Sequence, residues 1–332
     1  MAPTRRITQR DVATAARVST ATVSYVLSGR RGRARPVSDE TRDRVLAAVN
    51  RTGYRINHSA RSLRRQRTDV ACVVYPTPLN PGAEEIVNQF VPAATRCGLT
   101  TVCLPIVDGA VHDALNFLSG GSADAALLLR GHGLTPGQLH ALAAHLSIVA
   151  FDDHARPRGF DVVRTHRWPA QAMAVDRLAR AGRRRFAFFL HHSGELAETG
   201  YRAGLQRNGL AERTDWIRFV ATDRTAAHEA ALELLRGRTR PDAIVSASDR
   251  TAVQAIYAAQ ELGLRVPEDV AVIGSGDIDE GRAARPALTT IGPRIADRIV
   301  PVDRLFDRLA APGRLAGAQL DLPWLLTARD SG

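Results

Sequence analysis

The sequence contains no lysine, only three cysteines and no long hydrophobic run. No apolar stretch approaches the roughly 18 residues that a membrane-spanning helix requires. The basic segment at residues 1–10 lacks the apolar stretch of a secretory signal peptide. We therefore expect a cytoplasmic protein with no membrane partner.

The three cysteines, Cys72, Cys97 and Cys103, are an odd number and show no C-x-x-C spacing. Each lies in an apolar stretch, so we expect reduced thiols that fill the core. The adjacent His191 and His192 have no cysteine or carboxylate at ligand spacing. The sequence therefore predicts no metal site and no cofactor.

The formal net charge of +11 is concentrated at one end of the chain. Because lysine is absent, arginine supplies all of the positive charge, which reflects genomic base composition more than function. Residues 1–68 nevertheless contain 16 arginines and four carboxylates, whereas the rest of the chain is nearly balanced. Such a localised positive field suits a polyanion, and nucleic acid is the first candidate. A membrane surface is the alternative, but the segment has few large apolar anchors.

The segment from residue 5 to residue 55 predicts three short helices, each with a polar N-cap residue. The N-caps are Thr8 before residues 9–16, Ser19 before residues 20–27, and Ser38 before a helix that ends at Gly53. Asp11 completes a capping box with Thr8. The apolar positions have the spacing for helices that pack at a sharp angle. They are Val12, Ala13, Ala16, Val18, Val23 and Val26, with Val45, Leu46 and Val49 on the third helix.

From Val70 onward, short β-rich runs alternate with stretches of helical period. The expected strands are 70–74, 101–106, 125–129, 148–151, 186–190, 243–246 and 270–273. The expected helices are 84–97, 136–145, 169–181, 199–208, 226–236 and 251–262. Continuous apolar strands in alternation with helices predict parallel sheets covered on both faces. About 260 residues are too many for one small sheet, so we expect two similar α/β lobes.

Six stretches of the N-terminal segment form a pattern with a known counterpart. They are Asp11-Val12-Ala13, Val18 to Ser24, Val37 to Arg42, Val45 to Ala48, Gly53-Tyr54-Arg55 and Asn57 to Arg64. In their order and approximate spacing, these stretches resemble the LacI/GalR (lac repressor) family of bacterial transcriptional regulators. Fainter echoes, such as Gly200 to Ala203 and Val266 to Gly274, extend to about residue 325.

The resemblance implies an all-α helix-turn-helix head followed by an α/β periplasmic-binding-protein-like (type I) domain with two lobes and parallel sheets. Residues 1–56 would form the DNA-binding head and residues 57–68 a hinge helix with a linker. Residues 69–328 would form the effector-binding and dimerisation domain. Lobe 1 would comprise about 69–167 and 294–328, and lobe 2 about 168–293.

The resemblance makes the second helix the one that reads DNA. Val23 and Val26 face the core, and the N-terminus of the helix favours phosphate through its hydroxyls, N–H groups and dipole. The residues expected to contact base edges in the major groove are Thr20, Ala21 and Tyr25. The residues expected to contact phosphate are Thr8, Ser19, Thr22, Ser24, Ser28, Arg33 and Arg35. One alternative is that the arginine-rich loop at 30–36 is a solvated connection, and another is that the head is a three-helix bundle that binds protein.

Two residues of the head depart from the family pattern. Tyr25 stands where the family often has arginine, and the methyl groups of Thr20 and Ala21 favour thymine over a guanine contact. Arg17 stands in the turn, where glycine is usual because the backbone takes a positive φ. A residue other than glycine costs on the order of 1 kcal/mol there.

Residues 57–64 match the hinge helix of the family, which is too short to persist alone in water. In the family, two such segments pair in the dimer and fold in the minor groove, where a leucine wedges between base pairs and kinks the duplex. The matching hinge and minor-groove residues are Asn57, Ala60, Arg61, Leu63 and Arg64. The alternative for Leu63, the matching leucine, is an apolar linker residue that packs on the core.

The resemblance also implies an effector cleft, formed by polar groups at the carboxyl ends of strands. Four departures disfavour a simple sugar, whose hydroxyls need Asp, Asn and Arg partners and an aromatic platform. They are Ala197 for an arginine, Gly276 for an aspartate, Ser248 for an asparagine, and Gly82-Ala83 for two aromatics. The remaining effector-binding candidates are Tyr75, Thr77, Asp152, Arg224, Ser248 and Asp277. For each of them the alternative is a structural or solvated role.

No catalytic pair or phosphate loop is evident, and Gly274-Ser275-Gly276-Asp277 matches no dinucleotide motif. The sequence therefore predicts a homodimeric transcriptional repressor, not an enzyme, that binds near-palindromic double-stranded DNA and a small-molecule effector. One alternative is a DNA-binding regulator whose degenerate pocket senses no small molecule or responds to a protein partner. Another is a soluble ligand-binding or enzyme domain with an incidental basic head.

Overall fold

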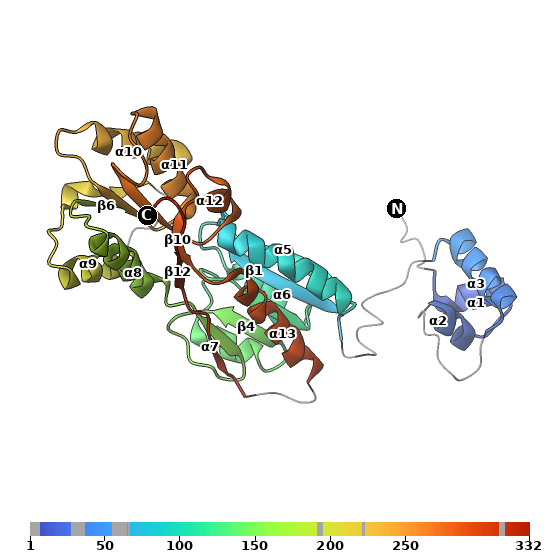
Figure 1. The fold of residues 1–332 in the computed structure, drawn as a ribbon. Helices are drawn as coiled ribbons and strands as arrows, with labels where there is room; N and C mark the ends of the chain where they lie inside the picture. The colour runs from blue at the N-terminus through green and yellow to red at the C-terminus, as the bar shows by residue number, and fades with distance from the viewer. Residues whose placement is uncertain are drawn as a thin grey trace. The chain divides into compact units, whose positions relative to one another are not determined.

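The computed structural model describes residues 7–27, 37–54, 65, 67–190, 195–220, 223–311 and 316–332. The chain divides into two compact units, Met1–Thr68 and Asp69–Gly332. The first unit is helical, and the second contains two six-stranded sheets (Figure 1).

The N-terminal unit contains α1 (Gln9–Ala16), α2 (Thr20–Leu27) and α3 (Asp39–Thr52). The three expected N-caps are confirmed. Thr8, Ser19 and Ser38 each accept a hydrogen bond from the backbone N–H three residues later. The apolar faces of the helices share one small core of buried residues: Val12, Ala13, Ala16, Val23, Val26, Val45 and Ala48.

Two details of this unit refine the sequence analysis. Leu46 is 43% exposed, so its expected place in the core was wrong. Ala48, three positions after Val45 and therefore on the same side of α3, is buried instead. Arg17 ends α1 in the left-handed conformation, with φ 53° and ψ 49°, as the turn was expected to require.

The first lobe contains a sheet with the strand order β11-β5-β4-β3-β1-β2, in which neighbouring strands are parallel. Its elements are β1 (Val70–Pro76), α5 (Pro81–Arg96), β2 (Thr100–Ile106), α6 (His112–Ser119), β3 (Ala125–Leu128), α7 (Pro136–Leu142), β4 (Ser147–Phe151), β5 (Asp161–Arg164), α13 (Val300–Ala310) and β11 (Gln319–Asp321). Side chains of α6 and α7 pack with one apolar cluster of the sheet, and those of α5 and α13 with another. The sheet is therefore covered on both faces, as expected.

The second lobe contains a sheet with the order β12-β10-β9-β8-β6-β7. Its elements are α8 (Arg167–Arg180), β6 (Phe186–Leu190), α9 (Glu195–Arg207), β7 (Ile217–Phe219), α10 (Arg224–Arg236), β8 (Ala243–Ser246), α11 (Asp249–Glu261), β9 (Ala271–Ser275), α12 (Asp279–Ala283), β10 (Thr289–Gly292) and β12 (Leu325–Thr327). Helices α10 and α11 contribute to one core cluster, and α8 and α9 to another. Strand β12 differs from the others because it runs antiparallel to its neighbour β10.

The division of the chain between the lobes differs from the expected one at the C-terminal end. The segment up to residue 328 was assigned to the first lobe, but only β11 joins that sheet. Strand β12 pairs with β10 of the second lobe. Beyond it, Ser331 donates from its hydroxyl to the carbonyl of Val272 at 2.6 Å. Residues 325–328 therefore belong with the second lobe.

A buried ion cluster attaches α13 to the first sheet. The Asp161 carboxylate, at the start of β5, accepts from Arg304 at 2.5 Å, from Arg308 at 2.6 Å and from the N–H of Ala318 at 2.7 Å. Asp161 is fully buried, and both of its oxygens are used, which makes this charge tolerable in the interior.

The cysteines are all free, but only one lies in the core. Cys72 on β1 is buried, and burial raises the pKa of its thiol to about 12. Cys97 and Cys103 are exposed, so the expectation that all three fill the core was wrong. Cys97 follows the last turn of α5, and Cys103 lies on β2, at the edge of the sheet. An apolar run at a sheet edge does not ensure burial.

Replacing Arg17 by glycine is expected to stabilise the N-terminal unit by about 1 kcal/mol, because glycine adopts a positive φ without steric cost. Hydrogen–deuterium exchange of peptides from α1 and α3 in the full chain measures this stability, and exchange through opening should slow about fivefold. Gly53→Ala is the matched control. Gly53 has φ +66°, and a Cβ at this position would meet no atom within 4 Å, so its substitution should speed exchange through backbone strain alone. Unchanged exchange in Arg17→Gly would contradict the strain at this turn.

Candidate functional site

The second helix of the N-terminal unit has one buried and one exposed face. Val23 and Val26 are buried, whereas Thr20 and Ala21 are exposed in its first turn. Tyr25, one turn later, is half-buried. The structure therefore leaves the expected base-contacting face accessible at the helix N-terminus.

The expected phosphate-contacting residues serve partly as helix caps. Thr8 is exposed and forms the capping box with Asp11. Ser19 is exposed and accepts from the N–H of Thr22 at 3.1 Å. Thr22 and Ser24 are half-buried. The following expected residues lie outside the part of the chain that the structure describes: Ser28, Arg33, Arg35, Asn57, Ala60, Arg61, Leu63 and Arg64.

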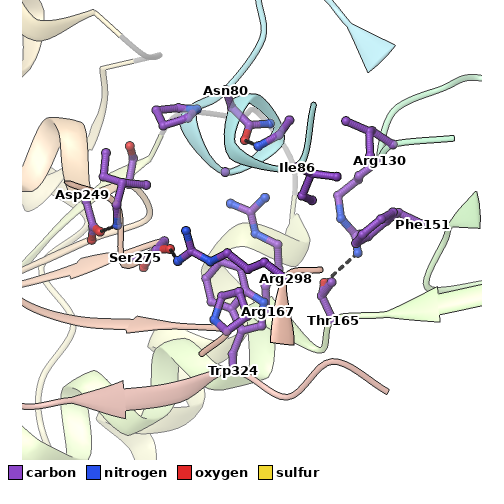
Figure 2. A pocket seen from close by; sticks show the side chains of 18 of the residues that line it. Asn80, Ile86, Arg130, Phe151, Thr165, Arg167, Asp249, Ser275, Arg298 and Trp324 are labelled. Atoms are coloured by element: carbon purple, nitrogen blue, oxygen red, sulfur yellow. Dashed lines mark hydrogen bonds between the residues drawn. The ribbon is translucent and has the colours of Figure 1, made fainter. Parts of the chain in front are cut away.

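The C-terminal unit contains a cleft at the carboxyl ends of strands from both sheets (Figure 2). It holds about 1010 Å³ of space between protein atoms, part of it open to solvent. Strands β3, β4, β5, β8, β9 and β10 all end at a lining residue or one residue before it, and α5, α8 and α11 begin at lining residues. The carboxyl ends of parallel strands are the usual place for a ligand in such folds, so the topology supports a binding site.

Arg130 forms three hydrogen bonds at one end of the cleft. It donates to both carboxylate oxygens of Asp153, at 2.6 and 3.0 Å, and to the hydroxyl of Thr165 at 2.7 Å. Burial disfavours ionised Asp153, but the hydrogen bonds and charge of Arg130 outweigh it and lower the pKa of the carboxyl. This pair fixes one wall of the cleft, where β3 and β5 end.

Arg167, the first residue of α8, lies over two indole rings. Its guanidinium carbon is 4.1 Å from the ring centroid of Trp168 and 5.4 Å from that of Trp324. Burial lowers the pKa of Arg167 to about 9, so the side chain remains cationic at neutral pH. The negative faces of the two rings stabilise this cation.

Arg298 lies in the segment between β10 and α13 and is only 2% exposed. It donates to the carbonyls of Gly276 and Asp277 at 2.7 and 2.8 Å and pairs with Glu85 of α5. Burial lowers its pKa, and its Nε has no hydrogen-bond partner among the described residues. A buried donor left without a partner costs about 1–3 kcal/mol, which an incoming acceptor would recover.

Asp249 and Ser275 form the opposite wall. The Asp249 carboxylate accepts from the hydroxyl of Thr290 at 2.5 Å and from the N–H of Ile278 at 2.9 Å. Burial raises the pKa of Asp249 to about 6. Ser275 accepts from Gln171 at 2.8 Å and donates to the carbonyl of Ser246 at 2.8 Å. Both side chains are therefore already occupied by protein partners.

Only one of the six expected effector-binding residues, Ser248, lines this cleft. Tyr75 packs against the core of the first lobe. Thr77 donates to the carbonyl of Ile106 at 3.0 Å. Asp152 accepts from the N–H groups of His154 and Ala155 at 2.7 and 2.9 Å. These contacts hold the three side chains in local structure, and none of the three residues lines the cleft.

The other two expected residues are held by ion pairs. Arg224 is bidentate to Glu280 on α12, at 2.9 and 3.2 Å. Asp277 is buried, has φ 52°, and pairs with Arg329 at 2.5 Å and Arg282 at 3.4 Å. Ala197 belongs to α9, but its side chain lies outside the described part.

Sequence reasoning missed the residues that dominate the lining, namely Arg130, Arg167, Arg250, Arg298 and Trp324. In a chain whose 45 basic residues are all arginine, a single arginine carries little signal. The position of Arg130, directly after the expected strand 125–129, was the available indication.

The described residues offer no metal site and no membrane span. Among them, no group of three or more His, Cys, Asp or Glu side chains could hold a metal ion. No helix of the described chain has both the length and the apolar character to cross a membrane.

Both units of the chain match known protein families. Residues 8–57 match the bacterial regulatory proteins of the lacI family, and residues 175–331 match the periplasmic binding protein-like domain. The chain is 28% identical over 294 residues to the HTH-type transcriptional repressor PurR of Haemophilus influenzae, covering 86% of this chain and 85% of that protein. It is 27% identical over 315 residues to the ribose operon repressor of the same species, covering 92% of each.

Solved structures share the fold along nearly the whole chain. A complex of the transcriptional regulator CelR with cellobiose has a TM-score of 0.66 and 25% identity, covering 98% of this chain and 100% of that one. The lac repressor dimer bound to operator and the anti-inducer ONPF has a TM-score of 0.76 and 24% identity, covering 98% and 99%. The helix-turn-helix head and the two-lobe α/β domain that the sequence predicts are therefore confirmed.

The raised pKa of Asp249 predicts a pH-dependent stability of the C-terminal unit. The folded state binds this proton more tightly than the unfolded state does, so the stabilisation is complete below about pH 4 and is lost as the pH rises through about 6. The native chain should therefore gain about 1 kcal/mol relative to Asp249→Asn between pH 8 and pH 5. Urea unfolding followed by tryptophan fluorescence measures this difference, because Trp168, Trp216 and Trp324 all lie in this unit. Parallel pH profiles for the two proteins would contradict the prediction.

Proposed function

Because the chain belongs to the LacI family of bacterial regulatory proteins, we propose that it is a DNA-binding transcriptional repressor whose operator affinity changes when a small molecule binds between its two α/β lobes. The observation that carries the DNA-binding half is α2, which exposes Thr20 and Ala21 at its N-terminus while Val23 and Val26 anchor it in the core. The chain then acts by binding, and no catalytic role is assigned to it.

The N-terminal unit is assigned the contacts with DNA. Thr20, Ala21 and Tyr25 read base edges in the major groove, and methyl contacts with thymine suit the first two. The phosphate contacts are assigned to Thr8, Ser19, Thr22, Ser24, Ser28, Arg33 and Arg35. The 16 arginines of residues 1–68 supply the positive field for a polyanion.

The oligomer is assigned as a homodimer on a near-palindromic operator, because two copies of one reading helix require two related half-sites. The lac repressor dimer bound to operator, which has this fold, provides the precedent. Residues 57–64 are assigned as the hinge, with Leu63 as the wedge in the minor groove and Asn57, Ala60, Arg61 and Arg64 around it.

The proposal that a small-molecule effector binds is based on the cleft between the two lobes. Six strands end at its lining and three helices begin there, and the CelR structure of the same fold contains cellobiose. The alternative of a degenerate pocket that senses no small molecule is not favoured. The site of action is the cytoplasm, where DNA and metabolites are both available.

Selection of genomic DNA by the purified full-length protein tests this function. At low salt we expect enrichment of a few fragments that share an inverted repeat. Affinity for an enriched fragment should fall by roughly 100-fold or more between 50 and 200 mM salt, since released counterions drive binding. A folded, dimeric preparation that enriches no fragment would rule out the proposal.

Ala21→Asp is expected to weaken operator binding by roughly 100-fold, because it places a carboxylate against phosphate and base edges. Ala47→Asp on α3 is the matched control, since Ala47 is also exposed on a helix of the same unit. Fluorescence anisotropy with a labelled operator measures both. Equal losses in the two variants would remove α2 from its assigned role.

Leu63→Ala is expected to reduce the operator bend and to weaken specific binding by about tenfold, a loss of about 1.4 kcal/mol. Energy transfer between dyes on the two operator ends reports the bend. Non-specific binding should be unaffected, because phosphate contacts remain. A native bend angle in the variant would show that Leu63 is an ordinary linker residue.

A further inference from the structure

The side-chain polar groups that line the cleft are mainly hydrogen-bond donors. The lining includes four arginines, Arg130, Arg167, Arg250 and Arg298, and guanidinium groups donate but never accept. The one carboxylate in the described lining, Asp249, has both oxygens engaged by Thr290 and Ile278. The cleft therefore offers donors while its carboxylate acceptor is occupied.

Several buried donor atoms in the lining lack a hydrogen-bond partner among the described residues. Besides Nη1 of Arg298, which forms an ion pair with Glu85, they include Nε of Arg298, Nε of Arg250 and Nε1 of Trp324. No acceptor atom of the described lining residues is buried in this way. Because buried polar groups are normally satisfied, the imbalance indicates a ligand that brings acceptors.

Charge alone does not define the site, because carboxylates lie beside several of these cations. Arg130 pairs with Asp153 and Arg298 with Glu85. Nε of Arg250 is 3.8 Å from Glu280, whose carboxylate also accepts two hydrogen bonds from Arg224 at the start of α10. These pairs hold the guanidinium groups in place, and Nε of Arg298 remains as a donor with neither a hydrogen bond nor an ion pair among the described residues.

Three helix N-termini add to the donor character. The helices α5, α8 and α11 begin at Pro81, Arg167 and Asp249, all of which line the cleft. The first N–H groups of a helix carry partial positive charge and favour an anion. The orphaned Nε of nearly fully buried Arg298 is the independent observation that makes these N-termini relevant.

A neutral polyol fits this lining less well than an anion. Sugar hydroxyls both donate and accept, so they need carboxylate or amide oxygens as well as donors. Here each Asp249 oxygen already accepts one hydrogen bond from the protein, and Asn80 Oδ1 accepts from the N–H of Ala83 at 3.0 Å. A phosphate or carboxylate only accepts. The apolar part of the lining, with Ile86, Phe151, Leu322 and Trp324, suits the non-ionic remainder of the same molecule.

We propose that the effector of this regulator is a small organic anion, a phosphate ester or a carboxylate, whose oxygens accept hydrogen bonds from Arg298 and from the donors around it. This inference rests on the proposed function and specifies the ligand class of its cleft (Figure 2).

Matched probes test the ligand class by isothermal titration calorimetry on the full-length protein. Each anion is paired with its neutral parent: ribose 5-phosphate with ribose, glucose 6-phosphate with glucose, and gluconate with glucose. At least one anion should bind saturably, with one site per chain and an affinity at least tenfold above that of its parent. The phosphate and carboxylate arms distinguish the two anion types. A parent that binds as tightly as its anion, or a panel in which no anion saturates, overturns the proposal.

Variants locate the binding. Arg298→Leu should lower the affinity for the bound anion at least tenfold, as should Arg167→Gln if Arg298→Leu fails to fold. Arg213→Gln is the control, because Arg213 is exposed and pairs with Asp215 outside the cleft. Affinity that survives both cleft substitutions overturns the proposal, since the anion then binds elsewhere, such as on the basic N-terminal unit.

Operator binding, measured on the same preparations, separates the two proposals. If the operator is bound but no anion is, the anion assignment fails and the regulatory function stands. If no DNA is bound, the regulatory function itself fails.

Discussion

The chain passes between its two sheets three times, and all three passages line the cleft. Arg167 lies on the passage from β5 to α8, Arg298 on that from β10 to α13, and Trp324 on that from β11 to β12. The segments that join the lobes therefore also carry the groups available to a ligand. A molecule in the cleft contacts these connecting segments directly. Its binding and the relative position of the lobes are therefore coupled.

Because the connecting segments line the cleft, a change in the arrangement of the lobes on ligand binding is physically reasonable. A ligand shifts the arrangement of two lobes only by the difference between its affinities for the alternative arrangements. Such a difference arises where a ligand bonds groups that only one arrangement of the lobes brings together. Arg298 is the clearest case, because it also bonds the carbonyls of Gly276 and Asp277 in the second lobe and pairs with Glu85 in the first.

The N-terminal unit could be predicted well because its signals are local. The caps at Thr8, Ser19 and Ser38, and the positive φ of Arg17, all follow from residues within one helical turn. The one misplaced core residue, Leu46, shows the limit of this reasoning. An apolar residue next to a buried one is easily assigned to the core until its angle around the helix is considered.

The cleft could be predicted only in outline. The sequence located the strand ends, but not which side chains were already used by the protein, and Thr77, Asp152 and Asp277 all bond within their own surroundings. Five strands of three or four residues, β5, β7, β10, β11 and β12, were not expected. They are too short to show a period, and four of them, β5, β10, β11 and β12, adjoin the passages between the lobes. The helices α6, α12 and α13 were missed as well.

The thiols of this protein are all in one of the two lobes. Cys72 is shielded and resists ionisation, whereas Cys97 and Cys103 are accessible, and both lie in the first lobe. The second lobe and the DNA-reading unit contain no cysteine. A maleimide dye added to the native chain would therefore mark one lobe alone, and the tryptophans that pack with the other lobe, Trp168, Trp216 and Trp324, would serve as intrinsic energy donors. The distance between the lobes could then be followed in solution without a substitution in the sequence.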